Sequence, residues 1–243
     1  MKSQNQMSTI THKTRTNHVT HVSFTGNENH VITLDKAIRL TEEYRRSVPE
    51  GSPLGGACSH DNFNQLLRQP TCVGIRIYNA ANDDDSPTSV LVGVNSNNYD
   101  LFAGILLTQP TMSPDSLVDL LTETNPAQTD QCHGAAGIGL TFPGTEARLI
   151  SLAEASRLTR NFRTSIQGSI TKGGFFGRNI FQKILNQPGC VGIHIYFARR
   201  DDERQTFVLA GIDASGRHFA KWPFGDDTYL CPPFCSPSNV LNR

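Results

Sequence analysis

The sequence repeats itself after 118 residues, and this repetition constrains the fold more than any other feature. The segment NQLLRQPTCVGIRIY, residues 64–78, returns as QKILNQPGCVGIHIY, residues 182–196. The match continues without a gap over residues 24–93 and 142–211. An in-register series of this length indicates a tandem duplication. We therefore expect two copies of one structural unit in the chain.

Each copy begins with the same order of predicted helices. A first amphipathic helix follows an N-cap residue, Thr33 in the first copy and Ser151 in the second. A Gly-containing loop comes next, GGACS in one copy and GGFFG in the other. A second, shorter helix follows, and Pro70 or Pro188 ends it because proline cannot continue a helix.

An antiparallel hairpin completes each copy. CVGIRIYNA and CVGIHIYFA alternate apolar and polar residues, which predicts a strand with one apolar face. An acidic turn leads to the return strand, SVLVGVN or FVLAGID, and a third strand follows. The sequence thus predicts an α+β fold: a duplicated α-α-β-β(-β) unit with pseudo-twofold symmetry, whose helices pack on one face of an antiparallel sheet. The two copies form either one continuous sheet or two packed lobes.

The duplication also divides the chain. Residues 1–20 are rich in Thr, Asn, Gln and His, and we expect a loosely ordered or disordered arm. The first unit is predicted at 21–114 and the second at 140–243. Residues 115–139 are predicted to contain a helix and a Gly-rich linker.

The unit resembles a group of small bacterial proteins of about one unit's length. The resemblance rests on the QPGC-x-GI-x-IY helix–strand junction, the hairpin and a CPPxC tail, and it covers most of the chain. It implies no activity. The first unit departs from this pattern at its end, where Thr108 and Met112 stand in the places that Cys231 and Cys235 occupy in the second unit.

The helix–strand junction contributes residues that we interpret as structural. A cysteine there suits a small apolar site, because free cysteine is commonly buried. The alternative, a thiolate nucleophile, lacks a base, since His194 would lie about 13 Å along the strand from Cys190. We interpret the glycines as packing or bulge positions, and the alternative is that they admit the close approach of a ligand or of the other unit's backbone. The structural set is Pro70, Cys72, Gly74, Pro188, Cys190 and Gly192.

The CPPFC segment is the most unusual local feature. The spacing of Cys231 and Cys235 is permitted in a zinc site, for which Cys132 and His133 are the obvious further ligands and His218 is another. A disulfide and a tail without special chemistry are the alternatives. Zinc is the only cofactor that the pattern suggests.

The polar residues of the first hairpin strands are the candidate ligand site. Arg76 and Tyr78 share one strand face, as do His194 and Tyr196, opposite the Val/Ile core. An interface between two copies is a natural binding groove, so we expect these four residues to line one. The copies differ at Arg76 and His194, which predicts an asymmetric site.

Charge and composition narrow the function. The formal net charge is zero, which speaks against nucleic acid as a partner. The chain has no apolar run long enough for a membrane span, and we expect a cytoplasmic protein whose six cysteines are free thiols or metal ligands. The leading hypothesis is a non-enzymatic binding or interaction module with a protein or small-molecule partner. A metal or redox protein based on Cys231 and Cys235 is the first alternative, and a hydrolase or transferase is the second.

Overall fold

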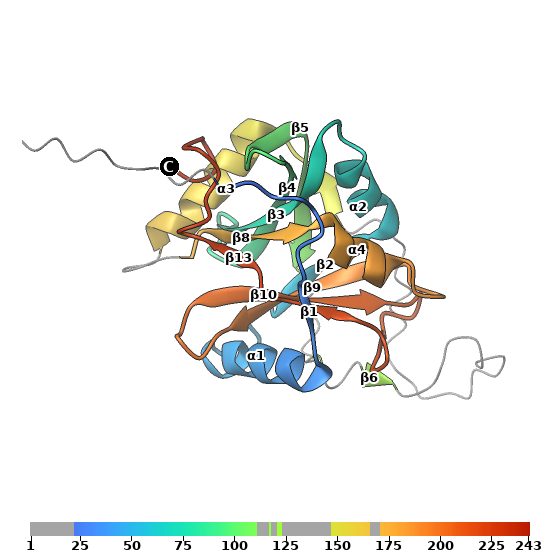
Figure 1. Ribbon diagram of the computed structural model, residues 1–243. Helices are drawn as coiled ribbons and strands as arrows, with labels where there is room; N and C mark the ends of the chain where they lie inside the picture. Colours follow the sequence, from blue (N-terminus) through green and yellow to red (C-terminus); the bar gives the residue numbers. More distant parts are fainter. Residues whose placement is uncertain (1–21, 111–116, 118–120, 123–146, 166–170) are drawn as a thin grey trace, which may run out of the picture.

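The computed structural model describes residues 22–110, 117, 121–122, 147–165 and 171–243, which form an α+β fold (Figure 1). These residues contain four helices and two antiparallel sheets. The helices are α1 (Leu34–Arg46), α2 (His60–Leu67), α3 (Leu152–Ser165) and α4 (Arg178–Leu185). In the described part of the chain, no helix is long and apolar enough to cross a membrane.

Except for β6 and β11, the strands pair into two antiparallel sheets, which we call sheet A and sheet B. Sheet A has the order β1 (Val31–Ile32), β12 (Phe224–Gly225), β10 (Gln205–Ile212), β9 (Gly192–Arg199) and β2 (Gly55–Ser59). Sheet B has the order β5 (Asp100–Pro110), β4 (Pro87–Asn95), β3 (Cys72–Ala81), β8 (Gly173–Gly177) and β13 (Tyr229–Cys231), with β7 (Ala147–Leu149) beside β5. A short antiparallel pairing between β2 and β5 joins the sheets into one hydrogen-bonded path.

The helix boundaries follow the predicted signals. The side chain of Thr33 accepts a hydrogen bond from the Lys36 N–H at 3.3 Å and caps α1. Ser151 caps α3 in the same way, through the Glu154 N–H at 3.1 Å. The short helices α2 and α4 begin 118 residues apart, and each ends shortly before its proline. The second helices and the hairpins thus recur at the spacing seen in the sequence.

The chain exchanges strands between its two parts, which we call the N-terminal half (residues 22–110) and the C-terminal half (residues 147–243). Strand β2 of the N-terminal half pairs with β9 of the C-terminal half. Strand β8 of the C-terminal half pairs in turn with β3 of the N-terminal half. The first helices cross over as well, because α1 packs on β9 and β10 whereas α3 packs on β3 and β4. Each hairpin is therefore completed by elements of the other half.

The prediction that GGACS and GGFFG are loops was wrong, because both segments are buried strands. Their glycines let the exchanged backbones meet. A Cβ on Gly55 would lie 2.2 Å from the carbonyl oxygen of Ile195, and one on Gly173 would lie 2.4 Å from that of Ile77. Any side chain would push the strands apart, so the glycine content reflects a close strand contact rather than a turn.

The junction residues lie in matching positions in the two halves. A Cβ on Gly74 would lie 2.3 Å from the carbonyl oxygen of Phe176, and one on Gly192 would lie 2.5 Å from that of Cys58. In both cases the neighbour is backbone of the other half. The thiols of Cys72 and Cys190 donate to the carbonyl oxygens of Gly74 and Gly192 at 3.1 and 3.2 Å.

The helices do not share one sheet face, which corrects the predicted packing. Ile193, Ile195 and Phe197 of β9 join a core that also contains α2 and α4, whereas Tyr196 and Ala198 pack with α1 on the opposite face. Helix α3 covers the corresponding face of sheet B. Figure 1 shows the resulting order of α3, sheet B, sheet A and α1, with α2 and α4 near one side. Both strand faces are buried because each sheet has a helix of the other half to cover it.

The segment between the halves differs in one respect from its prediction. Residues Leu121–Thr122, which were expected in a helix, form strand β6 and pair in parallel with β11 (His218–Phe219). Extended backbone here satisfies the hydrogen-bonding groups of β11. The predicted arm at 1–20 and most of the predicted linker lie outside the described residues.

Candidate functional site

The four residues predicted to line a ligand groove are buried and form two separate pairs. Arg76 and Tyr78 lie on β3 in sheet B, and both are fully buried. His194 and Tyr196 lie on β9 in sheet A, with 5% and 1% of their surfaces exposed. Tyr78 faces α3 and Tyr196 faces α1. The structure therefore joins the members of each pair but places the pairs on different sheets.

Arg76 lies in a buried polar cluster. Its guanidinium forms an ion pair with Asp100, and both side chains have no solvent exposure. Arg76 Nη2 also donates to Asn98 Oδ1, and Tyr78 Oη donates to Asp100 Oδ2 at 2.6 Å. Burial, reinforced by the nearby Asp100 carboxylate, raises the pKa of Tyr78, so its hydroxyl keeps its proton and acts as a donor.

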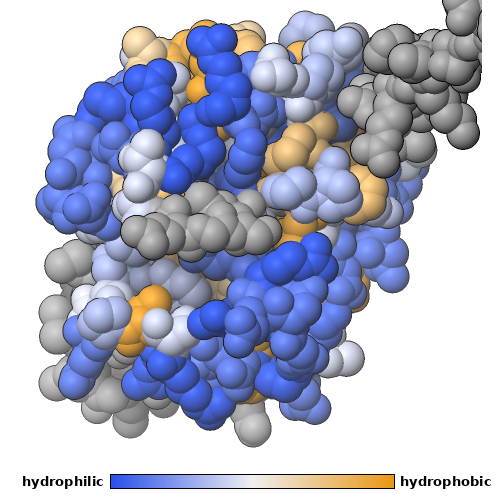
Figure 2. All heavy atoms as spheres, turned by 90° about the vertical axis from the view of Figure 1, so that its left-hand side faces the viewer, coloured by the Kyte–Doolittle hydropathy of each residue, from blue (hydrophilic) through white to orange (hydrophobic). Residues whose placement is uncertain are grey.

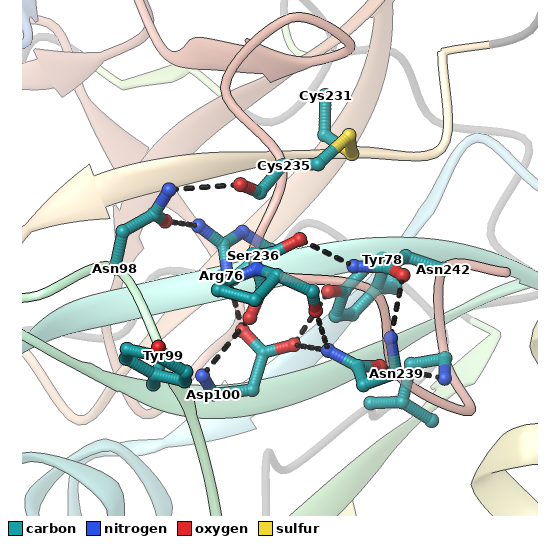
Figure 3. Close-up of polar contacts among 12 residues, drawn as sticks. Arg76, Tyr78, Asn98, Tyr99, Asp100, Cys231, Cys235, Ser236, Asn239 and Asn242 are labelled. Atoms are coloured by element: carbon teal, nitrogen blue, oxygen red, sulfur yellow. Dashed lines mark hydrogen bonds and ion pairs between the residues drawn. A yellow bond between two sulfur atoms is a disulfide. The ribbon is translucent and has the colours of Figure 1, made fainter. Parts of the chain in front are cut away.

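The C-terminal tail, residues 231–243, covers this cluster (Figure 3). Asn98 Nδ2 donates to the Cys235 carbonyl at 2.8 Å, and Arg76 Nη2 donates to the Phe234 carbonyl at 3.4 Å. The Asp100 N–H donates to Ser236 Oγ at 3.2 Å, and Asn239 Nδ2 donates to Asp100 Oδ2 at 2.9 Å. The cluster thus holds a segment of turns and bends through its carbonyl, hydroxyl and carboxamide groups.

A disulfide joins Cys231 and Cys235 at the start of this tail. The Cys231–Pro232 and Pro232–Pro233 peptide bonds between them are cis. The pairing differs from the expectation of free thiols, whereas Cys72 and Cys190 are free thiols. Cys132 and His133, the further zinc ligands suggested by the sequence, lie outside the described residues. Among the residues that are described, no group of three or more His, Cys, Asp or Glu side chains is arranged to hold a metal ion.

One strong donor of the cluster is unsatisfied. Arg76 Nε is buried and has no hydrogen-bond partner within the described residues. Buried polar groups are normally paired, so the tail does not satisfy every hydrogen-bond donor of this cluster.

Figure 2 shows the side of the molecule that lies on the left of Figure 1, where hydrophilic residues predominate with hydrophobic areas between them.

The C-terminal half has different residues at the corresponding positions. His194, Tyr196 and His218 each lie 118 residues after Arg76, Tyr78 and Asp100. Tyr196 Oη and His218 Nε2 lie 2.7 Å apart, and His218 Nδ1 lies 2.8 Å from the Gly211 carbonyl. A carbonyl can only accept, so Nδ1 carries the proton and Nε2 accepts from Tyr196. An Arg–Tyr–Asp set in one half therefore corresponds to a neutral His–Tyr–His set in the other.

We expect this histidine set to make the fold sensitive to acid. Burial lowers the pKa of His218 to about 4, although the Gly211 carbonyl and Asp213 oppose the shift. An unfolded histidine binds its proton below about pH 6.5, so stability is complete above that pH and is lost as the pH falls toward 4. We expect a loss of about 2 kcal/mol between pH 7 and pH 5 from His218. Urea titrations at both pH values measure it.

The variant His218→Gln is the control for this expectation. It keeps an acceptor for Tyr196 but does not titrate, so its free energy of unfolding should change less between pH 7 and pH 5. His194 remains in the variant, and burial together with the charge of a protonated His218 lowers its pKa too. An unchanged pH dependence in His218→Gln would contradict the assignment.

Comparison with known proteins adds no assignment. No family model matches the chain, and neither the curated proteins nor the solved structures give a match. The geometry of the site therefore carries the functional argument. Sequence reasoning identified Arg76 and Tyr78 but missed Asp100, Asn98 and the asparagines of the tail. The spacing of 118 residues between Asp100 and His218 was the available signal.

Proposed function

We propose that the protein is a non-enzymatic binding module that holds peptide segments on the face of sheet B that carries Arg76, which we call the Arg76 face. The observation that carries this proposal is the seating of residues 231–243 on the Arg76 cluster. The face contributes side-chain donors from Arg76 and Asn98, a carboxylate and a main-chain N–H from Asp100, and the tail supplies complementary groups. Backbone carbonyls and short polar side chains are therefore the chemistry that this face recognises.

We further propose that the module arose by tandem duplication and is an internal pseudo-dimer. The reciprocal pairing of β2 with β9 and of β8 with β3 supports this, because strand exchange of this kind is a common route to dimers. Equivalent positions carry an ion pair in one half and neutral histidines in the other. Only one of the two faces consequently carries charged groups, and we propose that only the Arg76 face binds peptide.

A cysteine-based redox role is the second candidate. It is favoured by one specific observation, the disulfide between Cys231 and Cys235 in the tail that covers the cluster. This role and peptide binding are compatible, since the same tail carries both features.

Displacement of the chain's own tail tests peptide binding. The double variant S236A/N239A removes the Ser236 and Asn239 hydrogen bonds to Asp100 from the tail. The bond to the Asp100 carboxylate contributes about 1.5 to 3 kcal/mol and the neutral bond to the Asp100 N–H about 1 kcal/mol, so the tail should be held about 100-fold more weakly. A tethered tail acts at an effective concentration of about 1 mM. A fluorescent, disulfide-closed peptide of residues 231–243 should then bind the variant with a midpoint near 10 µM, measured by anisotropy.

The matched control is the same peptide carrying the two alanines. The alanine peptide lacks the same hydrogen bonds as the variant's own tail. It should therefore bind the variant about 100-fold more weakly than the wild-type peptide does. Equal binding of both peptides, or no binding of the wild-type peptide up to 1 mM (~100 times the expected midpoint), would count against peptide recognition by this face.

A further inference from the structure

We infer that the Cys231–Cys235 disulfide controls access to the Arg76 face. In the oxidised chain the tail is fixed over the cluster, and reduction releases it so that a peptide segment of the same chemistry takes its place. This inference rests on the proposed peptide-binding function and adds its regulation.

The disulfide ties the tail to the sheet close to the site. Cys231 is fixed, because β13 pairs with β8 and the Cys231 carbonyl accepts a hydrogen bond from the Lys172 N–H at 2.7 Å. Cys235 and its neighbour Phe234 present the carbonyls that Asn98 and Arg76 bind. The bond thus connects a strand of sheet B directly to the residues that contact the cluster. Ring closure preorganises these carbonyls for binding.

The two sulfurs differ in accessibility, which determines the course of reduction. Cys231 is fully buried, whereas Cys235 is partly exposed, and the two prolines between them are exposed. A thiolate of a dithiol reductant therefore attacks Cys235 Sγ, and Cys231 leaves as a thiolate that takes up a proton. The second thiol of the reductant then attacks the reductant's sulfur in the mixed disulfide and releases Cys235. Two cysteine thiols and one oxidised reductant are the products.

The face remains formed when the tail leaves. Arg76 and Asp100 neutralise each other, Tyr78 donates to Asp100, and Asn98 accepts from Arg76, and none of these contacts involves the tail. The departing tail frees Asn98 Nδ2 and the Asp100 N–H, in addition to the unpartnered Arg76 Nε. A peptide that supplies acceptors to these three donors is the ligand that the open face selects.

Hydrogen exchange on the full chain tests the release. The reporters in the tail are the amides of Phe234, bonded to the Leu230 carbonyl, and of Leu241, bonded to Asn239 Oδ1. Opening a five-residue disulfide loop returns a chain entropy that corresponds to about 30-fold in an equilibrium constant. We expect these amides to exchange about 30-fold faster after reduction, with the amides of Ile75 and Ile77 in β3 unchanged.

The double variant C231S/C235S is the control. Its tail amides should exchange at the rate of the reduced chain, and reductant should not change that rate further, because the variant lacks the Cys231–Cys235 disulfide. Equal protection of the tail in oxidised and reduced wild-type chain would overturn the inference.

A second measurement separates this inference from the proposed function. The labelled, disulfide-closed peptide of residues 231–243 is added to C231S/C235S without reductant. If the peptide binds C231S/C235S but does not bind the oxidised wild-type chain, both proposals are supported. If the tail amides of C231S/C235S exchange fast but the peptide does not bind, the disulfide controls the tail and the peptide-binding function is rejected. If the tail is not released, control by the disulfide is rejected, even where the peptide displaces the weakened tail of S236A/N239A.

Discussion

Replacing Arg76 with methionine should lower the free energy of unfolding by about 3 to 5 kcal/mol. The substitution keeps much of the side-chain volume but leaves the Asp100 carboxylate buried without its cation, and an uncompensated buried charge carries a cost of this size. Asp100 would retain the hydrogen bonds from Tyr78 and Asn239, which cannot neutralise it. Urea unfolding followed by the fluorescence of Trp222, the only tryptophan, measures the loss.

Two further variants show whether the buried charge is the cause. Arg157→Met removes a largely exposed ion pair with Asp83, and we expect a loss of no more than about 1 kcal/mol. R76H/D100H copies the residues that the C-terminal half has at these positions and removes both charges. It should be more stable than R76M despite its two changes. An effect of R76M as small as that of R157M would mean that the loss of the ion pair with Asp100 is not costly in the fold.

Much of the fold was predictable because its elements carry local signals. The capped first helices, the proline-terminated second helices and the alternating hairpin strands each follow from a few adjacent residues. They lie where the pattern placed them. The strands β2 and β8 were not predictable in this way. Gly-rich segments of five residues are typical of loops, and each of these two pairs on one side with a strand of the other half of the chain.

The candidate site was also predictable only in part. Arg76 and Tyr78 share a strand face by the two-residue alternation, so their proximity was predictable. Their burial was not, because the covering tail lies more than 150 residues away and leaves no periodic pattern. The disulfide was one of three open alternatives for Cys231 and Cys235, since a spacing of four residues does not select between them.

Alanine at both Gly55 and Gly173 should destabilise the fold by about 5 kcal/mol. Each new Cβ would lie 2.2 to 2.4 Å from a backbone carbonyl oxygen of the opposing strand, and a strand cannot yield as a flexible side chain does. Overpacking of this kind costs about 1 to 3 kcal/mol at one site. The two glycines share no contact, so their effects should add.

Gly104→Ala is the matched control, because the same added methyl group would meet only the side chains of Gln69 and Leu149, at 3.3 and 3.9 Å. Gly104 is buried, but these two side chains can move, so we expect it to cost less than about 1 kcal/mol. The single variants G55A and G173A should each lose about half of the effect of the pair, because β2 and β8 make the same contact in opposite halves. If either single variant were as stable as G104A, its exchanged strand would not contribute to holding the halves together. The fold would then depend on only one of the two exchanges.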